Sequence, residues 1–353
     1  MHTYMLFIFA FVCSFSLTTS LILSPCAKWN TTGIVIAGTG ERGNKSDQLT
    51  DPRSIFFLKQ TQTLYVADAG NNRIQKFSID SPSKIGVTVI SNVQYVTDIY
   101  VDYENNKPAI YLSLGGEQRV RKWIEGESDS VPVGGPCPFC EGVWVDKEKN
   151  VYMSSASRHC VYKWSPETNI PIVVAGKEDY SGSSSNNLNS PEGVYVDNIR
   201  NAIYVADYAN NRVQKWFIGA SNGTTIAGLS SGEAGSDKES LKRPTSVWVD
   251  DETQVIYIAD SQNQRIQRWL YNSSIGETIA GGLGTGDKLT QFDQPDDIAF
   301  DNDGNLYVCD RINERVMMFS IIDNQSCFPS STNRLNSLSF IIFITTVFTF
   351  FYP

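Results

Sequence analysis

The stretch IYVADYANNRVQKW, residues 203–216, decides the fold of this chain. Two short runs rich in Val, Ile and aromatic residues flank a polar turn that contains two Asn residues, which is the pattern of a β-hairpin. Within each run, large apolar residues alternate with smaller or polar ones, as in half-buried strands. The segment alone therefore predicts two antiparallel strands.

Related segments recur in phase along the chain, and this repetition predicts the architecture. A further strand precedes the hairpin, as in GVWVD from Gly142, and a fourth follows it, as in TIAG from Thr225. Four antiparallel strands in about 40–50 residues are typical of a propeller blade. We therefore expect an all-β fold, a six-bladed β-propeller of four-stranded antiparallel blades. The six hairpins start at Leu64, Ile110, Val151, Ile203, Ile256 and Leu306.

The two ends of the repeat array predict how the ring closes. The fourth-strand motif occurs as GIVIAG from Gly33, before the first full copy, and no such motif follows the last copy at Phe319. The N-terminal strand should therefore complete the last blade. Closure of this kind removes an open sheet edge that would favour aggregation.

The repeated residues resemble a known family. The run Tyr-Val-Ala-Asp, followed by Asn-Asn-Arg-Ile/Val-Gln-Lys-Phe/Trp, is similar to the NHL repeat, and the resemblance covers roughly residues 32 to 320. Copies two and three depart from it, because Leu114 and Ser155 replace the Asp and Cys160 replaces the Arg. The resemblance implies a propeller that is secreted or anchored at the cell surface.

In the four regular copies, an Asp recurs with an Arg at fixed spacing. Asp side chains bond turn backbones, and Arg pairs well with a carboxylate, so we expect these pairs to build the ring. The pairs are Asp68 with Arg73, Asp207 with Arg212, Asp260 with Arg265, and Asp310 with Arg315.

The N-terminal residues 1–20 are expected to be a signal peptide. Leu6 to Leu17 form a short apolar core, and Thr18 and Ser20 are small residues before the expected cleavage point. An uncleaved anchor is the alternative. The propeller domain is placed at residues 21–326.

The C-terminal tail, residues 327–353, carries a second targeting pattern. Leu338 to Pro353 is an apolar run that follows the small residues at 330–332 and a short polar spacer. This order is similar to a GPI-attachment signal. A short tail-anchor helix in the membrane is the alternative.

Glycosylation sequons agree with a secretory route. Together with the two ends, they predict a protein at the extracellular face of the plasma membrane, either GPI-anchored or secreted. The sequons begin at Asn30, Asn44, Asn222, Asn272 and Asn324.

Cysteine usage predicts disulfides. Of the 7 cysteines, Cys13 lies in the expected signal peptide, and the even remainder suits an oxidising compartment. Cys26 precedes the closing strand and Cys327 follows the last one, so we expect this pair to staple the ring.

A second disulfide is expected in blade three. Cys140 precedes the inner strand and Cys160 lies in the hairpin turn, so the two could bond. Alternatively, Cys137 could replace Cys140, or Cys137 and Cys140 could pair within CPFC. Cys309 replaces a strand Ala and is expected to be a buried free thiol.

Composition excludes several functions. The net charge of -9 gives no counterion-release gain on nucleic acid, so no nucleic-acid partner is expected. The 2 histidines are His2 and His159, and His159 is expected in a solvated turn. A Ser-His-Asp triad is disfavoured. The zinc site of the lyases that resemble this family is also disfavoured, because several histidines hold the zinc ion in those proteins.

Carboxylates just before the inner strands offer the remaining catalytic hypothesis. Inner strands of a propeller begin near one channel mouth, so these side chains could converge there and bind Ca²⁺. They would then support a lactonase- or esterase-like hydrolase similar to other six-bladed propellers. The alternative is that they cap turns and hydrate the rim, with no cofactor. The candidates are Asp98, Glu141, Glu192, Asp296 and Asp297.

The main functional prediction is a non-catalytic binding module, with an extracellular protein or another ligand as partner. Hairpin turns, inner-strand approaches and the long loops at 177–190 and 229–243 should share one end of the ring. These loops are rich in Ser, Gly and Asn and could vary without cost to the core. We expect a partner there, near blades two to four, with Arg158, Tyr180 and Glu192 among its contacts. Simple drift of unconstrained turns is the alternative.

Overall fold

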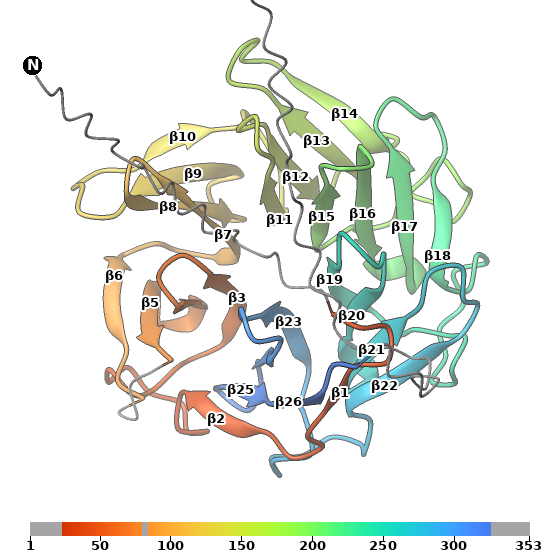
Figure 1. Ribbon diagram of the computed structural model, residues 1–353. Coiled ribbons are helices and arrows are strands. Elements are labelled where there is room, and N and C mark those ends of the chain that lie inside the picture. The colour runs from red at the N-terminus through yellow and green to blue at the C-terminus, as the bar shows by residue number, and fades with distance from the viewer. Residues whose placement is uncertain (1–22, 80–83, 326–353) are drawn as a thin grey trace, which may run out of the picture.

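The computed structural model describes residues 23–79 and 84–325, which fold into a ring of six four-stranded antiparallel blades (Figure 1). The predicted fold class is confirmed. Blade one contains β3 (Pro52–Leu58), β4 (Thr63–Asp68), β5 (Arg73–Ser78) and β6 (Val87–Ser91). Blade two contains β7 (Val96–Glu104), β8 (Lys107–Leu114), β9 (Arg119–Ile124) and β10 (Val131–Val133). Blade three contains β11 (Cys140–Val145), β12 (Val151–Ser155), β13 (Cys160–Trp164) and β14 (Pro171–Gly176).

The second half of the ring repeats this order. Blade four contains β15 (Val194–Asp197), β16 (Ala202–Asp207), β17 (Arg212–Phe217) and β18 (Thr224–Gly228). Blade five contains β19 (Pro244–Val249), β20 (Ile256–Asp260), β21 (Arg265–Trp269) and β22 (Gly276–Gly281). Blade six contains β23 (Pro295–Phe300), β24 (Leu306–Asp310), β25 (Arg315–Phe319) and β2 (Ile34–Ala37). The first strand of each blade lies innermost, and these strands contact one another around the centre (Figure 1).

The N-terminal strand closes the ring as predicted. In blade six, β2 pairs with β25 through Ile34 opposite Met318 and Val35 opposite Met317. A second closure was not predicted: β1 (Lys28–Trp29) pairs with β26 (Ile321–Asp323) in a separate two-stranded sheet. The first and last described segments of the chain are therefore paired with each other in two places.

The hairpin at residues 203–216 forms as the sequence indicates. Asp207 lies opposite Arg212 in the β16–β17 pair, and the 3₁₀ turn Tyr208–Asn210 connects the two strands. Asn211 closes the turn with φ 52°, a left-handed conformation that Asn tolerates better than most residues. The repeated Tyr, here Tyr204, is buried among residues of the blade core.

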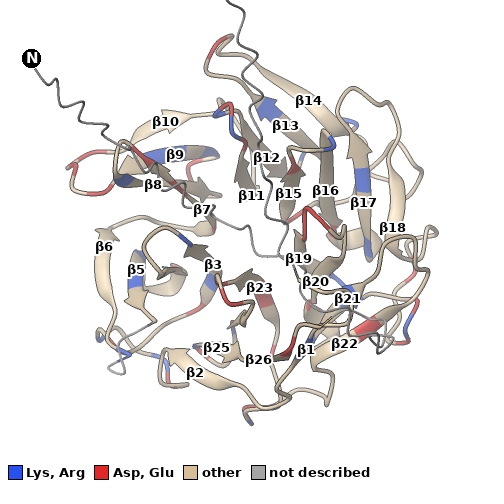
Figure 2. Ribbon diagram, in the orientation of Figure 1, with Lys and Arg blue, Asp and Glu red and all other residues tan. Residues whose placement is uncertain are grey.

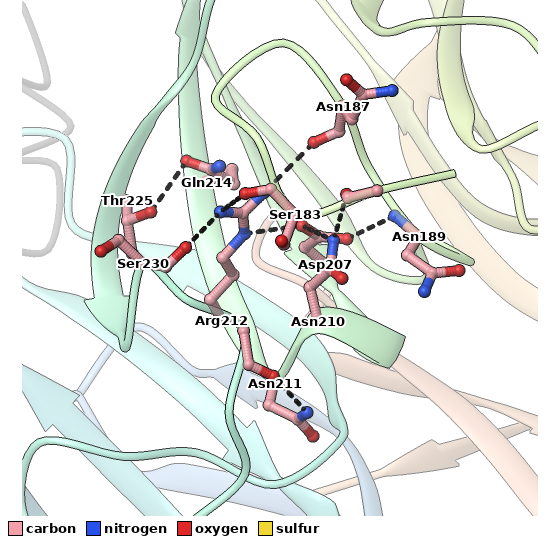
Figure 3. Close-up of polar contacts among 12 residues, drawn as sticks. Ser183, Asn187, Asn189, Asp207, Asn210, Asn211, Arg212, Gln214, Thr225 and Ser230 are labelled. Carbon is pink, nitrogen blue, oxygen red and sulfur yellow. Dashed lines mark hydrogen bonds and ion pairs between the residues drawn. The ribbon is translucent and has the colours of Figure 1, made fainter. Parts of the chain in front are cut away.

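The predicted Asp–Arg pairs are confirmed, and they do more than shape the turn (Figure 3). Arg212 Nε donates to Asp207 Oδ2 at 2.8 Å. Its Nη1 also donates to the carbonyl oxygens of Ser183 at 2.6 Å and Ser230 at 3.0 Å, in the loops before blades four and five. The guanidinium therefore pins long loops to the blade. Equivalent ion pairs join Asp68 with Arg73, Asp260 with Arg265, and Asp310 with Arg315.

These long loops are less free than the sequence suggested. The loops at 38–51, 177–193, 229–243 and 282–294 precede blades one, four, five and six. Each contributes one fully buried apolar side chain to the core, which a loop that varies without cost would not do. The buried side chains are Leu49, Leu188, Leu241 and Phe292.

Blades two and three lack the Asp–Arg pin, since Leu114 and Ser155 replace the Asp, and the loops that precede these blades are short. Residues 92–95 and 134–139 alone connect these blades to the previous ones. Cys137 of the second loop forms a disulfide with Cys140, the first residue of β11, with their Cα atoms 5.1 Å apart. A covalent link therefore stands where longer loops carry an ion pair.

The predicted Cys140–Cys160 pairing is wrong, and the alternative within CPFC, Cys137 with Cys140, is the one found. Ser155 of β12 pairs with Cys140 on one side and with Cys160 on the other, so a whole strand separates the two cysteines. Two inter-strand steps span about 9.5 Å, beyond the Cα separation that a disulfide bridges. Cys160 and Cys309 are buried free thiols, as expected for Cys309. Cys26 is disulfide-bonded; Cys327 lies outside the described residues, so their pairing stays a prediction.

Candidate functional site

One end of the ring, called here the loop face, gathers the variable segments. Strand register places the hairpin turns, the starts of the inner strands and the ends of the fourth strands at this end; Asp207, Arg212 and Gly228 are successive neighbours there. The predicted sharing of one face is confirmed. Long loops border blades four, five, six and one. Only short loops lie at blades two and three, and this part of the face is called here the low sector.

Two rings of residues follow one another where the inner strands enter the channel. The mouth ring lies nearest the loop face, and the deeper ring is one residue further along each strand. The mouth ring consists of Arg53, Thr97, Glu141, Glu192, Thr245 and Asp296, and the deeper ring of Ser54, Asp98, Gly142, Gly193, Ser246 and Asp297. The predicted carboxylates therefore all reach the channel but occupy two levels. Figure 2 shows acidic residues on β23, one of the inner strands around the centre of the ring.

The deeper carboxylates join neighbouring blades. Asp98 accepts hydrogen bonds from the backbone N–H of Val143 at 2.8 Å and lies 2.6 Å from the Ser54 hydroxyl. Asp297 accepts from the N–H of Ile55 at 2.9 Å and from the Ser246 hydroxyl at 2.6 Å. Each carboxylate thus links its own blade to both neighbours, which supports the structural interpretation of these two residues.

Glycine replaces the carboxylate in blades three and four because the blades approach closely there. A Cβ on Gly142 would lie 2.6 Å from the carbonyl oxygen of Glu192, and one on Gly193 would lie 2.6 Å from that of Thr245. Real Cβ atoms do not make such contacts, so neither position accepts a side chain.

The mouth carboxylates have a different environment. Among the described residues, none donates a hydrogen bond to the side chains of Glu141 or Glu192, and Arg311 Nη1 lies 3.7 Å from Asp296 Oδ2. Burial raises the pKa of Glu141 to about 7, while Arg53 opposes this increase and Asp296 adds to it. Burial also raises the pKa of Asp296 to about 6, although Arg311 and Arg53 oppose this. The pKa of Glu192 is raised by burial and by both neighbouring carboxylates.

These carboxylates do not form a ready metal site. Within residues 23–79 and 84–325, no group of three or more His, Cys, Asp or Glu side chains is arranged to hold a metal ion. In the deeper ring, Asp98 and Asp297 are already occupied by N–H and O–H donors. The calcium centre therefore stays a prediction.

The aspartates at the opposite ends of the inner strands accept hydrogen bonds from nearby donors. Asp146 accepts hydrogen bonds from the N–H and side-chain amide of Asn150 at 2.9 and 2.7 Å. Asp250 accepts from the N–H of Thr253 at 2.8 Å and from that of Leu23 at 2.9 Å. These side chains cap turns, in contrast to those of the mouth ring.

An aromatic belt lines the channel below the two rings, and sequence analysis missed it. Each inner strand contributes one ring to the wall of a central cavity of about 430 Å³. From Phe56 round to Phe300 successive rings contact one another, with centroids 5.0 Å apart for Tyr100 and Trp144 and 4.3 Å apart for Trp144 and Tyr195. The belt consists of Phe56, Tyr100, Trp144, Tyr195, Trp248 and Phe300.

A second hollow opens on the low sector of the loop face. This groove, of about 620 Å³, runs from the turn at Gly115 and Gly116 to Glu141 in the mouth ring. Tyr95 and Phe139 border it and are 71% and 61% exposed. Exposed aromatic side chains beside a groove are typical of an interaction surface.

The predicted contact residues occupy two places on this face. Arg158 forms an ion pair with Asp179 at 2.6 Å, and the ammonium of Lys177 lies 4.2 Å from the ring centre of the exposed Tyr180. These residues belong to the blade three turn and the following loop, whereas Glu192 lies inside the channel mouth.

His159 is not a freely solvated turn residue. Its Nδ1 accepts a hydrogen bond from the backbone N–H of Ser190 at 3.1 Å and so ties the blade three turn to the next loop. The imidazole therefore has a structural partner.

Comparisons with known proteins agree with this architecture. The NHL repeat model matches residues 188–216. Peptidyl-glycine alpha-amidating monooxygenase B of Xenopus laevis is 29% identical over 146 residues, which is 39% of this chain and 16% of that protein. The chain thus spans less than a fifth of this relative. The protein is a six-bladed β-propeller that carries the NHL repeat.

Solved structures share the fold at low sequence identity. An auxiliary nutrient binding protein from Bacteroides thetaiotaomicron superposes with a TM-score of 0.65 at 14% identity, covering 84% of this chain and 77% of that one. A gluconolactonase from Xanthomonas campestris gives 0.61 at 10% identity, covering 85% and 97%. Binding proteins and enzymes both have this fold, so function must be argued from the site.

Within the described ranges, no helix has the length and apolar character needed to cross a membrane.

Proposed function

We propose that the protein is a non-catalytic binding module whose loop face receives an extracellular protein or another ligand. The observation that carries this proposal is the groove between Tyr95 and Phe139, which leads directly to the channel mouth at Glu141. Both aromatic side chains are exposed to solvent instead of packing in the core. Binding residues are often found at such loop positions.

The neighbouring loop supports the same face. Tyr180 is 59% exposed, and the exposed Arg158–Asp179 pair beside it adds little to stability in water. Alanine at Arg158 or Tyr180 should therefore weaken partner binding without lowering the melting temperature.

Proximity labelling on cells that display the full chain tests the proposal. Partners labelled by the wild type should be lost from a Tyr95→Ala, Phe139→Ala double variant. A Tyr271→Ala variant is the control, since Tyr271 is 57% exposed in a loop at the opposite end of the ring. Loss of labelling in the Tyr271→Ala variant alone would place the partner on the opposite face of the ring and contradict the proposal.

We also propose that the protein is held at the outer cell surface by a GPI anchor. The asparagines of all five sequons, at 30, 44, 222, 272 and 324, are exposed, which is compatible with glycosylation. Residues 1–20 and 327–353, where the signal peptide and anchor signal are expected, lie outside the described residues. Phosphatidylinositol-specific phospholipase should release the protein from cells, whereas retention would favour a tail helix.

A calcium-dependent hydrolase remains the alternative prediction. Convergence of Glu141, Glu192 and Asp296 on one mouth favours it, and the lack of a three-ligand arrangement in the described part of the chain does not. A calcium titration, with the melting temperature measured at each calcium concentration, distinguishes the hydrolase from the non-catalytic binding module. A calcium-induced rise in melting temperature that Glu192→Gln abolishes would support the hydrolase.

A further inference from the structure

When its carboxyl groups are ionised, the mouth of the channel carries a net negative charge. Glu141, Glu192 and Asp296 lie there with two guanidinium groups, and Arg311 Nε is 2.6 Å and Arg53 Nε is 3.7 Å from the oxygens of a fourth carboxylate, that of Asp51. Glu141 and Glu192 receive no hydrogen bond from any described residue. A site of this kind favours a positively charged guest, because opposite charges attract strongly where water is scarce.

The wall below the carboxylates suits an organic cation. Trp144 and Trp248 belong to the aromatic belt, and the faces of aromatic rings attract ammonium and guanidinium groups. Trp144 Nε1 is buried without a hydrogen-bond partner in the described part of the protein. An ammonium or guanidinium group cannot accept from this indole N–H, so an acceptor elsewhere on the guest, such as a carbonyl oxygen, is needed to satisfy it.

The size and rigidity of the cavity further limit which ligands it can bind. About 430 Å³ falls within the range of small-molecule sites. The close contacts of Gly142 and Gly193 with the next blades fix the backbone around the mouth. A metal ion needs several oxygens at set distances, whereas an organic cation requires only nearby charge and aromatic surface.

We propose that the central cavity binds an organic cation, an alkylammonium or guanidinium group, which enters from the loop face between Glu141, Glu192 and Asp296 and reaches the belt at Trp144. This inference rests on the proposed binding function and names the ligand chemistry of the mouth. The cation can belong to a free amine or to a Lys or Arg side chain of a protein that occupies the groove.

Calorimetric titration of the full chain at pH 8 tests this. The probes are Nα-acetylarginine methylamide, its neutral isostere Nα-acetylcitrulline methylamide, and agmatine as a free small cation. The arginine probe should bind at least tenfold more tightly than the citrulline probe. Agmatine binding as tightly as the arginine probe indicates a free amine, and a clear preference for the arginine probe indicates a protein side chain.

Two variants and a control locate the site. Glu192→Gln keeps the shape of the side chain and should raise the Kd of the arginine probe at least tenfold, and Glu141→Gln provides a second isosteric test. Glu167→Gln neutralises an exposed carboxylate in a loop at the opposite end of the ring and should leave the Kd unchanged.

Three results would overturn the inference: equal affinity for arginine and citrulline probes, no effect of both mouth variants, or binding of calcium with no binding of either cationic probe. The proposed binding function can still stand in each case, because partner labelling through Tyr95 and Phe139 is measured separately.

Discussion

Asp98 and Asp297, from blades two and six, hold one hydroxyl between them. Ser54 Oγ lies 2.6 Å from Asp98 Oδ1 and 2.9 Å from Asp297 Oδ2. A hydroxyl carries a single proton, so it donates to one carboxylate, and the other contact requires a protonated carboxyl. Burial and the neighbouring Asp297 accordingly raise the pKa of Asp98 to about 7. We therefore expect the pair to share a proton near neutral pH.

Stability should therefore fall as the pH rises from about 5 to about 8. The pKa values of Asp98 and Glu141 are raised to about 7 and that of Asp296 to about 6, well above those of unfolded carboxyls. Between the unfolded and folded pKa values the folded state binds more protons, so the free energy of unfolding decreases with pH. Thermal melts across this range measure the effect. A melting temperature that rises from pH 5 to pH 8 would contradict the assignment.

Ser54→Ala should destabilise the protein more at pH 8 than at pH 5. Without the hydroxyl, two carboxylates face each other with less compensation once both are ionised, at a cost of about 1–3 kcal/mol. Ser246→Ala is the matched control, since its hydroxyl bonds Asp297 alone at 2.6 Å. The control should show a smaller dependence on pH, and equal pH dependence in both variants would reject the shared proton.

Replacing Arg212 by Met should strongly destabilise the protein, whereas the same change at Arg119 should have little effect. Arg212 is 1% exposed and pairs with the fully buried Asp207, so its loss leaves a buried charge at a cost of about 3–5 kcal/mol. Arg119 holds the equivalent position in blade two but is exposed, with Leu114 in place of the Asp. Denaturant unfolding of both variants provides the comparison. Similar losses would show that the ion pair does not carry the stability.

Sequence periodicity was sufficient for the blades, because Tyr204 and its counterparts recur with the hairpin in every copy. The Asp207–Arg212 pair was likewise predictable, since both residues lie within one hairpin. Contacts between blades could not be predicted from the sequence. Trp144 and Tyr195 touch across two inner strands, and each looked like an ordinary core residue in its own strand. Their signal was an aromatic at the same position of successive inner strands.

The groove and the blade three disulfide depended on three-dimensional detail that a repeat alignment does not contain. The groove exists because the loops at 92–95 and 134–139 are short while the others are long. Cys140 and Cys160 lie at the same end of one blade, but the register inserts Ser155 between them. Position along a strand was predictable, whereas lateral distance was not.

Peptide mapping without reduction should recover Cys137 linked to Cys140, and should find Cys160 and Cys309 as free thiols. Burial raises the pKa of Cys160 to about 12, so alkylation in the native state should be slow and should become rapid on unfolding. Mass spectrometry after differential alkylation measures both. A Cys140–Cys160 fragment would contradict the strand register.

Trp29→Ala should weaken the closure of the ring. Trp29 is 4% exposed, its ring packs on Tyr257 with centroids 5.8 Å apart, and its Nε1 donates to the Gly304 carbonyl at 2.8 Å. Loss of a buried Trp costs about 3–5 kcal/mol. Lys28→Ala is the control, because Lys28 is the exposed neighbour in the same short strand and should change stability by about 0.5 kcal/mol or less. Trp29→Phe should fall between them, because it keeps an aromatic ring and loses the hydrogen bond. If Trp29→Ala unfolds no more readily than Lys28→Ala in urea, then β2 alone closes the ring, and the β1–β26 pair adds nothing to its stability.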